Sequence, residues 1–336
     1  MTELTLLVPE LSRCLQFVGE RTIEGEPRRW LGQARPVVHG HRHLSEGVFR
    51  LFGYPSADNY PSGAICCHSL SPDGAGDQAW LLLTPARFEA DLTRLVVSEL
   101  PIETHLPQAL IRQLDSLLAE YDLGLAHHGG ALLAYGDWLK QVHYSMPAEE
   151  TLGRNVAEAL PRSDEPEIER RFRKLFNDIQ MLLHAFFQNP GEPFHSRFNG
   201  FWPHSAGCLP STVPKPEFDR VLSNWPLARA MAECAGIGWQ ALPDRLDDCG
   251  WAAQRNLMVW HSDDKHTPEH RLQLLIRDCL NPLQQHLASG KLTRLNLLAE
   301  RLGGWVFQPS QRWLFWRRRK SLLAAWKQLQ RCAHGH

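Results

Sequence analysis

Short apolar segments alternate with longer segments of helical periodicity in this sequence, and this alternation constrains the fold most. Apolar runs of strand length lie at residues 4–8, 63–67 and 80–83. Segments 88–99 and 107–121 show helical spacing, with apolar residues recurring every three or four positions in the second. Strands and helices mixed in this order predict an α/β protein in which covering helices pack on a mixed sheet.

The remaining segments extend this pattern. Residues 123–126 and 131–135 flank a His-His-Gly-Gly turn and predict a β-hairpin. A proline- and acid-rich stretch at 146–167 is typical of a linker or a surface excursion. Segments 167–187, 218–234 and 271–288 are predicted helices, the first with a continuous apolar stripe. Near the end, segments 292–298, 305–307 and 313–316 are predicted strands.

These segments divide the sequence into three regions. Residues 1–145 form an N-terminal α/β region, and residues 146–290 form a mainly helical middle region with a Trp/Gly-rich loop. Residues 291–336 form a C-terminal β-ribbon with a basic end. A single compact domain that contains all three regions is the alternative.

Charge and hydropathy exclude several classes of protein. The sequence has 36 Lys and Arg against 37 Asp and Glu, a net charge of −1, which argues against binding polyanions over the whole surface. We expect no membrane insertion, because no stretch approaches 18 uninterrupted apolar residues. No signal-peptide pattern is visible, so we expect a cytoplasmic protein whose eight cysteines are reduced thiols.

Two histidine clusters are candidate metal sites. His39, His41 and His43 would share one face of a strand, but no carboxylate or cysteine lies beside them, so a solvated loop is the simpler interpretation. The second cluster mixes imidazoles with carboxylates and would suit Zn or Mn. Its members are His261, Asp263, Asp264, His266 and His270. A polar loop that enters a helix capped by Thr267 explains the same residues without a metal, and we expect no cofactor.

The C-terminal segment is strongly basic. Between residues 312 and 331 it holds seven cations, no acid and three tryptophans. Its densest run of cations could contact a polyanion such as nucleic acid, and consists of Arg317, Arg318, Arg319 and Lys320. The alternative is an edge strand whose cations prevent edge-to-edge pairing.

Motifs for nucleotide phosphates and for serine hydrolases are absent from the sequence. There is no G-x-x-x-x-G-K-[ST], no G-x-G-x-x-G and no G-x-S-x-G. Ser205 follows His204, but adjacency in the sequence does not make a catalytic triad.

Four segments in a fixed order resemble one protein family. They are Leu-Gly-Arg-Asn-Val-Ala-Glu-Ala-Leu-Pro at 152–161, Asn-Asp-Ile-Gln-Met-Leu-Leu-His at 177–184, Asn-Gly-Phe-Trp-Pro-His-Ser-Ala-Gly at 199–207 and Trp-Leu-Phe-Trp-Arg-Arg-Arg at 313–319. This order resembles the RpfE-type regulatory proteins of bacteria, which are related to cofactor-independent phosphoglycerate mutase. The resemblance implies a cytosolic regulatory or interaction protein.

Two of these segments predict one site. Asn177, Gln180 and His184 are spaced to share a helix face. The loop that follows would bring four further side chains toward them, Asn199, Trp202, His204 and Ser205. These residues form either a ligand site or a structural clasp that satisfies backbone groups of the loop.

The resemblance to the mutase also shows departures. Such enzymes need a Ser or Thr nucleophile and two metals held by Asp and His, and their first strand typically ends in Asp. Here residues 4–8 are followed by Pro9 and Glu10, and no Asp-His dipeptide occurs. We therefore expect a protein without the catalytic set that binds another protein or a small phosphorylated ligand. The alternative is a metal-dependent phosphotransfer enzyme, mutase- or phosphatase-like, that uses Asp263, Asp264 and His266.

Overall fold

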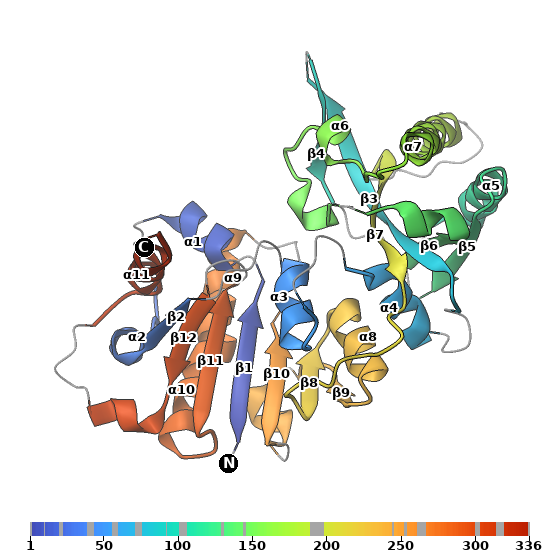
Figure 1. The fold of residues 1–336 in the computed structure, drawn as a ribbon. Helices are drawn as coiled ribbons and strands as arrows, with labels where there is room; N and C mark the ends of the chain where they lie inside the picture. The colour runs from blue at the N-terminus through green and yellow to red at the C-terminus, as the bar shows by residue number, and fades with distance from the viewer. Residues whose placement is uncertain are drawn as a thin grey trace. The chain divides into compact units, whose positions relative to one another are not determined.

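The structure is a computed structural model, shown in Figure 1. It describes residues 2–9, 11–19, 23–38, 44–55, 60–70, 76–91, 93–100, 106–128, 131–143, 146–188, 198–243, 245–251, 254–260, 267–299, 303–313 and 319–334. Two compact units divide the chain. Unit 1 comprises Met1–Pro55 and Pro214–His336, and unit 2 comprises Ser56–Val213. This division does not follow the sequence boundaries at residues 145 and 290.

Unit 2 is an insertion into unit 1. The chain leaves unit 1 after Pro55 and returns at Pro214. These two crossing points are neighbours, because a Cβ built on Gly53 would lie 3.3 Å from the Cβ of Pro214. Adjacent ends are the arrangement at which a fold tolerates an inserted domain, since the host chain continues almost as if uninterrupted.

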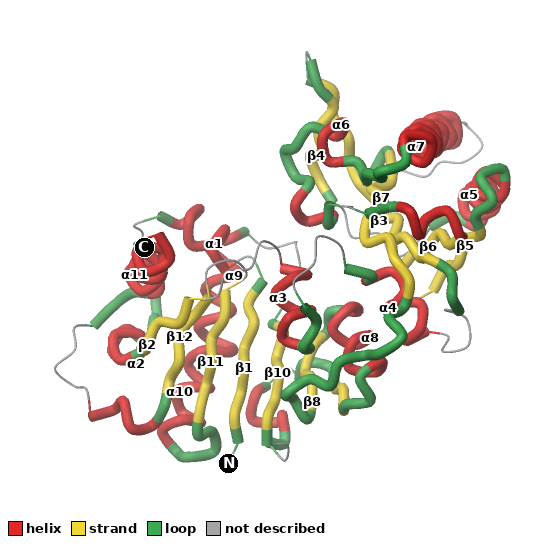
Figure 2. The backbone as a smooth tube through the Cα atoms, viewed as in Figure 1, coloured by secondary structure: helices red, strands yellow, loops and turns green. Residues whose placement is uncertain are grey.

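Unit 1 is built on a seven-stranded sheet of order β2-β12-β11-β1-β10-β8-β9. The strands are β1 (Glu3–Val8), β2 (Arg35–Val38), β8 (Arg220–Ser223), β9 (Gly238–Gln240), β10 (Arg255–Val259), β11 (Arg294–Ala299) and β12 (Gly303–Phe307). β1 pairs in parallel with both β10 and β11, while β12 and β2 are antiparallel. Figure 2 shows β1 in the middle of this mixed sheet.

Helices cover the sheet of unit 1. They are α1 (Leu11–Val18), α2 (Arg28–Gln33), α3 (Leu44–Leu51), α8 (Pro226–Cys234), α9 (Pro268–Leu274), α10 (Asn281–Ala288) and α11 (Leu322–His334), with short 3-10 turns η3 (Leu246–Cys249) and η5 (Pro309–Trp313). Leu4, Leu6 and Val8 alternate along β1 and point into one core, which α1, α10 and α11 close.

One helix of unit 1 departs from regular geometry. Instead of a continuous helix at 271–288, α9 and α10 are joined by a π-helical turn, η4 (Leu275–Leu280). Pro282 lies in the first turn of α10 and has no N–H to donate, so a wider turn before it avoids the clash of its ring with the preceding turn. The predicted cap is present, since the Thr267 side chain accepts a hydrogen bond from the N–H of His270 at 3.3 Å.

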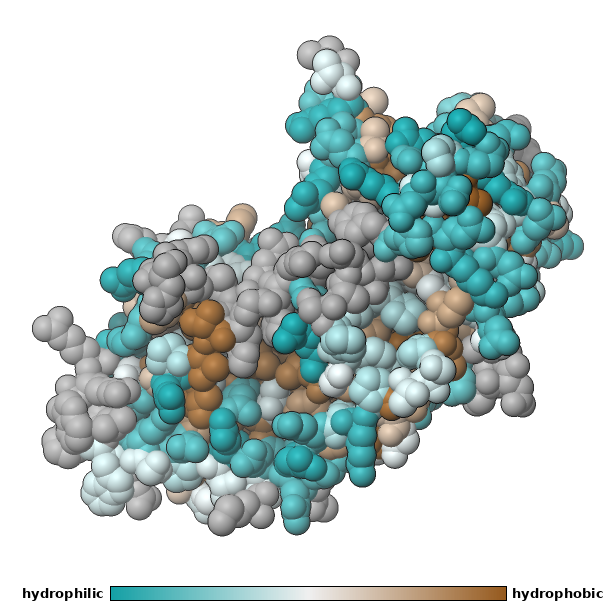
Figure 3. Space-filling model, viewed as in Figure 1, coloured by the Kyte–Doolittle hydropathy of each residue, from teal (hydrophilic) through white to brown (hydrophobic). Residues whose placement is uncertain are grey.

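Unit 2 is built on an antiparallel sheet of order β4-β3-β6-β5, with β7 on β3. Its strands are β3 (Ala79–Ala90), β4 (Leu95–Glu99), β5 (Gly124–His128), β6 (Ala131–Gly136) and β7 (Gly200–Cys208). Its helices are α4 (Ser62–Leu70), α5 (Gln108–Ala119), α6 (Val156–Ala159) and α7 (Pro166–Phe187), with 3-10 turns η1 (Asp137–Gln141) and η2 (Ala148–Glu150). In the view of Figure 3 the surface of unit 2 is mainly hydrophilic, because its apolar residues are buried between α7 and the sheet.

The α/β class, the mixed sheet, the hairpin β5–β6 and the helices α5 and α7 are confirmed. Two predicted elements are wrong: residues 63–67 belong to helix α4, and residues 88–99 form the end of β3 and the strand β4. The predicted helix at 218–234 is confirmed only in its second half, α8, because the segment begins with strand β8. The Trp/Gly-rich loop of the middle region contains strand β7, and this region also holds the strands β8, β9 and β10. The ribbon β11–β12 is part of the large sheet. Of the predicted strand 313–316, Trp313 lies in η5 and the rest lies outside the described residues.

Gly304 provides a test of the β11–β12 pairing. A Cβ on this residue would run into the carbonyl of Leu297 on β11, whereas a Cβ on Gly238 of β9 would meet only ordinary contacts, the nearest at 3.7 Å. We expect Gly304→Ala to lower the free energy of unfolding by about 2 kcal/mol or more, as overpacking does, and Gly238→Ala to change it far less. Urea unfolding followed by circular dichroism measures both, and equal stabilities of the two variants would contradict the observed pairing.

Candidate functional site

Asn199 and Trp202 hold β7 in place. The Oδ1 of Asn199 accepts a hydrogen bond from the N–H of Phe88 at 2.7 Å, and its Nδ2 donates to the carbonyl of Phe88 at 2.8 Å. The side chain thus replaces a backbone partner at the start of β7. Trp202 is fully buried and donates from Nε1 to the carbonyl of Met146 at 2.9 Å. Both contacts are those of a structural clasp.

The predicted helix face of α7 does not come together as one site. Gln180 reaches β7, where its Nε2 donates to the carbonyl of Phe201 at 3.3 Å. Asn177 and His184 are exposed, and His184 shares a hydrogen bond with Gln188 one turn further on. The shared face lies at the border between the buried and the exposed side of the helix, so only its middle residue contacts the sheet.

His204 and Ser205 form a buried polar chain with Thr84. The Nε2 of His204 lies 2.8 Å from Thr84 Oγ1, and its Nδ1 lies 2.9 Å from Ser205 Oγ. Ser205 has a left-handed φ of 58° at the point where the pairing of β7 with β3 shifts register. Burial lowers the pKa of His204 to about 4, so the imidazole is neutral and its two nitrogens serve the two hydroxyls.

The residues predicted as metal ligands lie almost entirely outside the described ranges. His39, His41 and His43 do so, as do His261, Asp263, Asp264 and His266. His270 is described, in the first turn of α9. Within the ranges that the structure describes, no three His, Cys, Asp or Glu side chains group as ligands.

The basic C-terminal run is described only in part. Arg317 and Arg318 lie outside the described residues, while Arg319 and Lys320 directly precede α11. The two tryptophans of this segment that the structure describes lie in different environments, because Trp313 is exposed in η5 and Trp326 is buried in the core of unit 1. Trp316 lies outside the described residues.

A pocket in unit 2 is formed by the segment 152–161, which carries the resemblance. Isolated bridges Val97–Leu152 and Val96–Asn155 attach this segment to β4. Between them Gly153 has a left-handed φ of 73° and donates from its N–H to Val97, and a Cβ on it would meet only open space. The Asn155 side chain then caps α6 by accepting from the N–H of Ala157 at 3.2 Å. This cap fixes the start of α6 and therefore the positions of its side chains.

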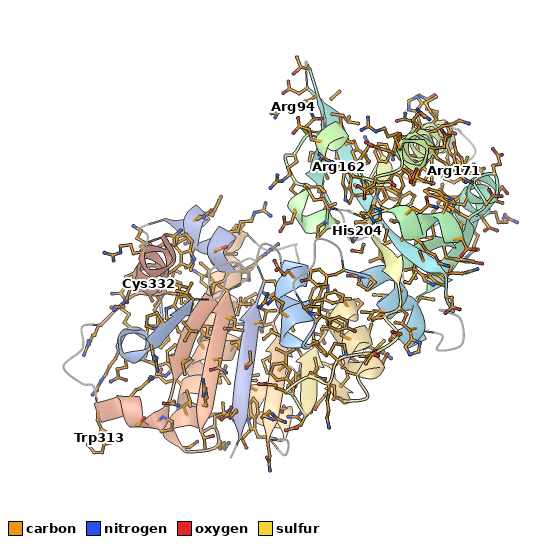
Figure 4. All side chains as sticks on the ribbon, viewed as in Figure 1. Arg94, Arg162, Arg171, His204, Trp313 and Cys332 are labelled. Atoms are coloured by element: carbon orange, nitrogen blue, oxygen red, sulfur yellow. The ribbon has the colours of Figure 1, made fainter. Side chains whose placement is uncertain are left out.

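Three guanidinium groups and one imidazole line this pocket, which we call the arginine pocket. Its volume is about 740 Å³, the guanidinium groups are those of Arg94, Arg154 and Arg162, and the imidazole is that of His143. Met146 and Ala159 supply apolar lining. Figure 4 shows Arg94 beside the β3–β4 turn and Arg162 beside α6.

Backbone carbonyls orient two of these arginines. Nε of Arg154 donates to the carbonyl of Glu150 at 3.0 Å, and Nη2 of Arg162 donates to the carbonyl of Glu158 at 3.0 Å. Each guanidinium has five N–H donors, so most of its donors stay available after one such bond. The carbonyls therefore restrict the side chains without using up their capacity to bind an anion.

Positive charge exceeds negative charge in the arginine pocket. Glu158 is the one acid among its described lining residues, and its Oε1 already accepts from Asn155 Nδ2 at 3.1 Å. Arg94 pairs with Asp91 at 3.5 Å and His143 with Asp164 at 3.4 Å, but these side chains are more than half exposed. Exposed pairs contribute little free energy, so an anion can replace them.

Arg154 belongs to the segment 152–161 that carries the resemblance, whereas the sequence did not predict Arg94, His143 or Arg162 as site residues. Nothing local marks these residues, because they come from separate segments that meet only when β4, α6 and the loop after η1 pack together. No helix in the described part of the chain is long and apolar enough to cross a membrane.

The two units define an α/β protein in which a second unit with an antiparallel sheet is inserted into a first unit with a mixed sheet. The PH0037 protein from Pyrococcus horikoshii is similar in fold, with a TM-score of 0.53, 9% identity and coverage of 96% of this chain and 91% of that chain. The cofactor-independent phosphoglycerate mutase from Thermoplasma acidophilum DSM 1728 aligns with a TM-score of 0.46 and 13% identity over 96% and 94%. No family model matches, and a comparison with curated proteins found no relative.

His204 predicts a pH dependence of stability. Its folded pKa of about 4 lies below the ordinary value of 6.5, so the unfolded chain takes up the proton first as the pH falls. The neutral His204 contributes fully to the free energy of unfolding above pH 6.5, and this contribution is lost as the pH falls toward 4. The free energy of unfolding should therefore fall by about 2 kcal/mol between pH 7 and pH 5. Urea unfolding at both pH values measures this loss.

His204→Asn is the matched variant, because it removes the titration and keeps a polar side chain. We expect the variant to be less stable at pH 7 and to lose about 2 kcal/mol less than the native chain between pH 7 and pH 5. If the free energy of unfolding changes equally with pH in both proteins, His204 does not cause the pH dependence.

Proposed function

We propose that this chain is a regulatory protein of the RpfE type, related to cofactor-independent phosphoglycerate mutase, that binds a small phosphorylated molecule in the arginine pocket of unit 2. The observation that carries this proposal is the convergence of Arg94, Arg154 and Arg162 on one cavity whose described lining holds a single carboxylate, that of Glu158. The order of the four sequence segments supports the family resemblance.

The chemistry of the pocket suits a phosphate ester. A guanidinium binds two oxygens of a phosphate at once through parallel N–H donors, and such charge-assisted bonds are stronger than neutral ones. A cavity of about 740 Å³ has the size of a metabolite site rather than that of a single inorganic ion. Met146 and Ala159 would contact the carbon skeleton of the ligand.

The sequence at the end of β1 supports binding without phosphotransfer. β1 ends at Val8 and continues into Pro9 and Glu10, where mutase-like enzymes typically place a metal-binding Asp. No Asp-His dipeptide occurs in the 336 residues. A protein that keeps such a fold and binds a phosphorylated ligand without turning it over would act as a sensor of that ligand.

One observation favours a metal-dependent phosphotransfer enzyme as the second candidate. β10 lies next to β1 and ends at Val259, and the His/Asp cluster begins in the sequence at His261. Open α/β sheets bind ligands beyond the carboxyl ends of their strands. A phosphatase and mutase assay with Mn²⁺ or Zn²⁺ tests this candidate. Turnover that His266→Ala abolishes and the exposed-site control His184→Ala preserves would establish the enzyme and contradict a purely regulatory role.

The arginine pocket predicts a charge-specific loss of ligand binding. We expect Arg154→Ala and Arg162→Ala each to weaken the binding of 3-phosphoglycerate about tenfold or more, because each removes charge-assisted hydrogen bonds. The affinity of Arg154→Lys should lie between those of the native chain and Arg154→Ala, since lysine keeps the charge and loses the bidentate geometry. Isothermal titration calorimetry on the full chain measures the dissociation constants.

Arg170→Ala is the matched control, because Arg170 is an exposed cation of unit 2 on α7 that pairs with Glu167 and lies outside the pocket. Its affinity for the same probe should equal that of the native chain. If the control and the pocket variants bind alike, or if the native chain does not bind phosphorylated probes, the proposed function is wrong.

A further inference from the structure

Four cations of unit 1 meet at a second cavity that the proposed function does not use. Arg28 and Arg29 stand at the start of α2, and Arg319 and Lys320 stand just before α11. Together they line a cavity of about 670 Å³. We call this cavity the terminal basic pocket. It uses two of the four cations that the sequence predicted as a polyanion contact.

Backbone and side-chain bonds bring the two chain segments together. The N–H of Lys320 donates to the carbonyl of Arg28 at 2.9 Å. Glu26 reinforces this junction, since its Oε1 accepts from the N–H of Leu322 at 3.1 Å and its Oε2 accepts from Arg28 Nε at 3.2 Å. The cations therefore stand on a braced junction of two helix starts rather than on independent loops.

The acid in this pocket already accepts hydrogen bonds from within unit 1. The Glu26 side chain is 2% exposed and fully engaged by Leu322 and Arg28, and it is the only acid among the described lining residues. Arg29 and Arg319 make no hydrogen bond or ion pair with any residue that the structure describes. Four cations against one buried carboxylate leave an excess positive charge that an anion can neutralise.

The shape and lining of the cavity decide the kind of anion. A concave site with cations from two segments surrounds a compact group with several charges, whereas an extended nucleic-acid strand needs a groove with aromatic platforms for its bases. Among the described residues of the C-terminal segment no tryptophan provides such a platform, because Trp313 is not a lining residue and Trp326 is buried. The uncharged lining comes from Pro27, Gln284, Ser321, Leu323 and Ala324.

We infer that the terminal basic pocket binds a polyphosphate group, as carried by a small molecule of the di- or triphosphate class. Several phosphoryl groups in a row match cations that approach from two sides, and each guanidinium can engage two oxygens. The first turn of α11 adds favourable partial charge beside the pocket, which supports an anion there without being needed for the site.

The test uses the full chain and inorganic tripolyphosphate as the probe. We expect Arg29→Ala and Arg319→Ala each to raise the dissociation constant about tenfold, and the double variant to raise it further. Arg229→Ala is the matched control, because Arg229 is an exposed cation of unit 1 on α8 that lies outside the cavity. Arg154→Ala in the arginine pocket should leave at least one tripolyphosphate site intact, which separates this inference from the proposed function.

Three outcomes would overturn the inference. One is an unchanged tripolyphosphate affinity in the Arg29→Ala and Arg319→Ala double variant. Another is loss of all tripolyphosphate binding in Arg154→Ala alone, which would place the probe in unit 2. The third is a single-stranded oligonucleotide that binds more tightly than tripolyphosphate at equal salt and displaces it, which would make the surface a nucleic-acid contact.

Discussion

The parallel pairing of β1 with β10 and β11 is the interaction on which unit 1 depends. It joins residues 3–8 to strands near positions 255 and 294, so the sheet cannot form until the chain beyond unit 2 has returned. Leu4 and Leu6 are completely buried at this junction. The insertion of unit 2 is compatible with this constraint because Gly53 and Pro214 are neighbours and hold the exit and the return together.

Both basic pockets use the same physical device. Main-chain hydrogen bonds fix the segments that carry the arginines, and the nearby acid is engaged by a donor of the fold itself. In the described lining of each pocket one carboxylate faces three or more arginine and lysine side chains, so the local charge stays positive in a protein of net charge −1. Charge that is balanced over the whole sequence is therefore unbalanced locally, because packing brings cations from separate segments together.

The buried polar residues of unit 2 hold the strands of its sheet together. Thr84, His204 and Ser205 satisfy one another where β3 and β7 shift register, and Asn199 replaces a backbone partner. A buried imidazole without a charge partner stays neutral, as the lowered pKa of His204 reflects. Polar residues that resemble a site in the sequence can thus be explained by the requirement that buried donors and acceptors find partners.

The sequence by itself determined the elements whose pattern is long and periodic, such as α5, α7 and the hairpin β5–β6. It failed where short apolar runs have no distinctive period, so that residues 63–67 read as a strand and form α4, and where pairing with a distant strand made β4 from a predicted helix. The spacing predicted that Asn177, Gln180 and His184 share a helix face, but it did not predict that only Gln180 would contact β7. Only the tertiary structure brought Arg94 to Arg162 and Arg28 to Lys320, because such neighbours are set by packing between segments that carry no local signal of each other.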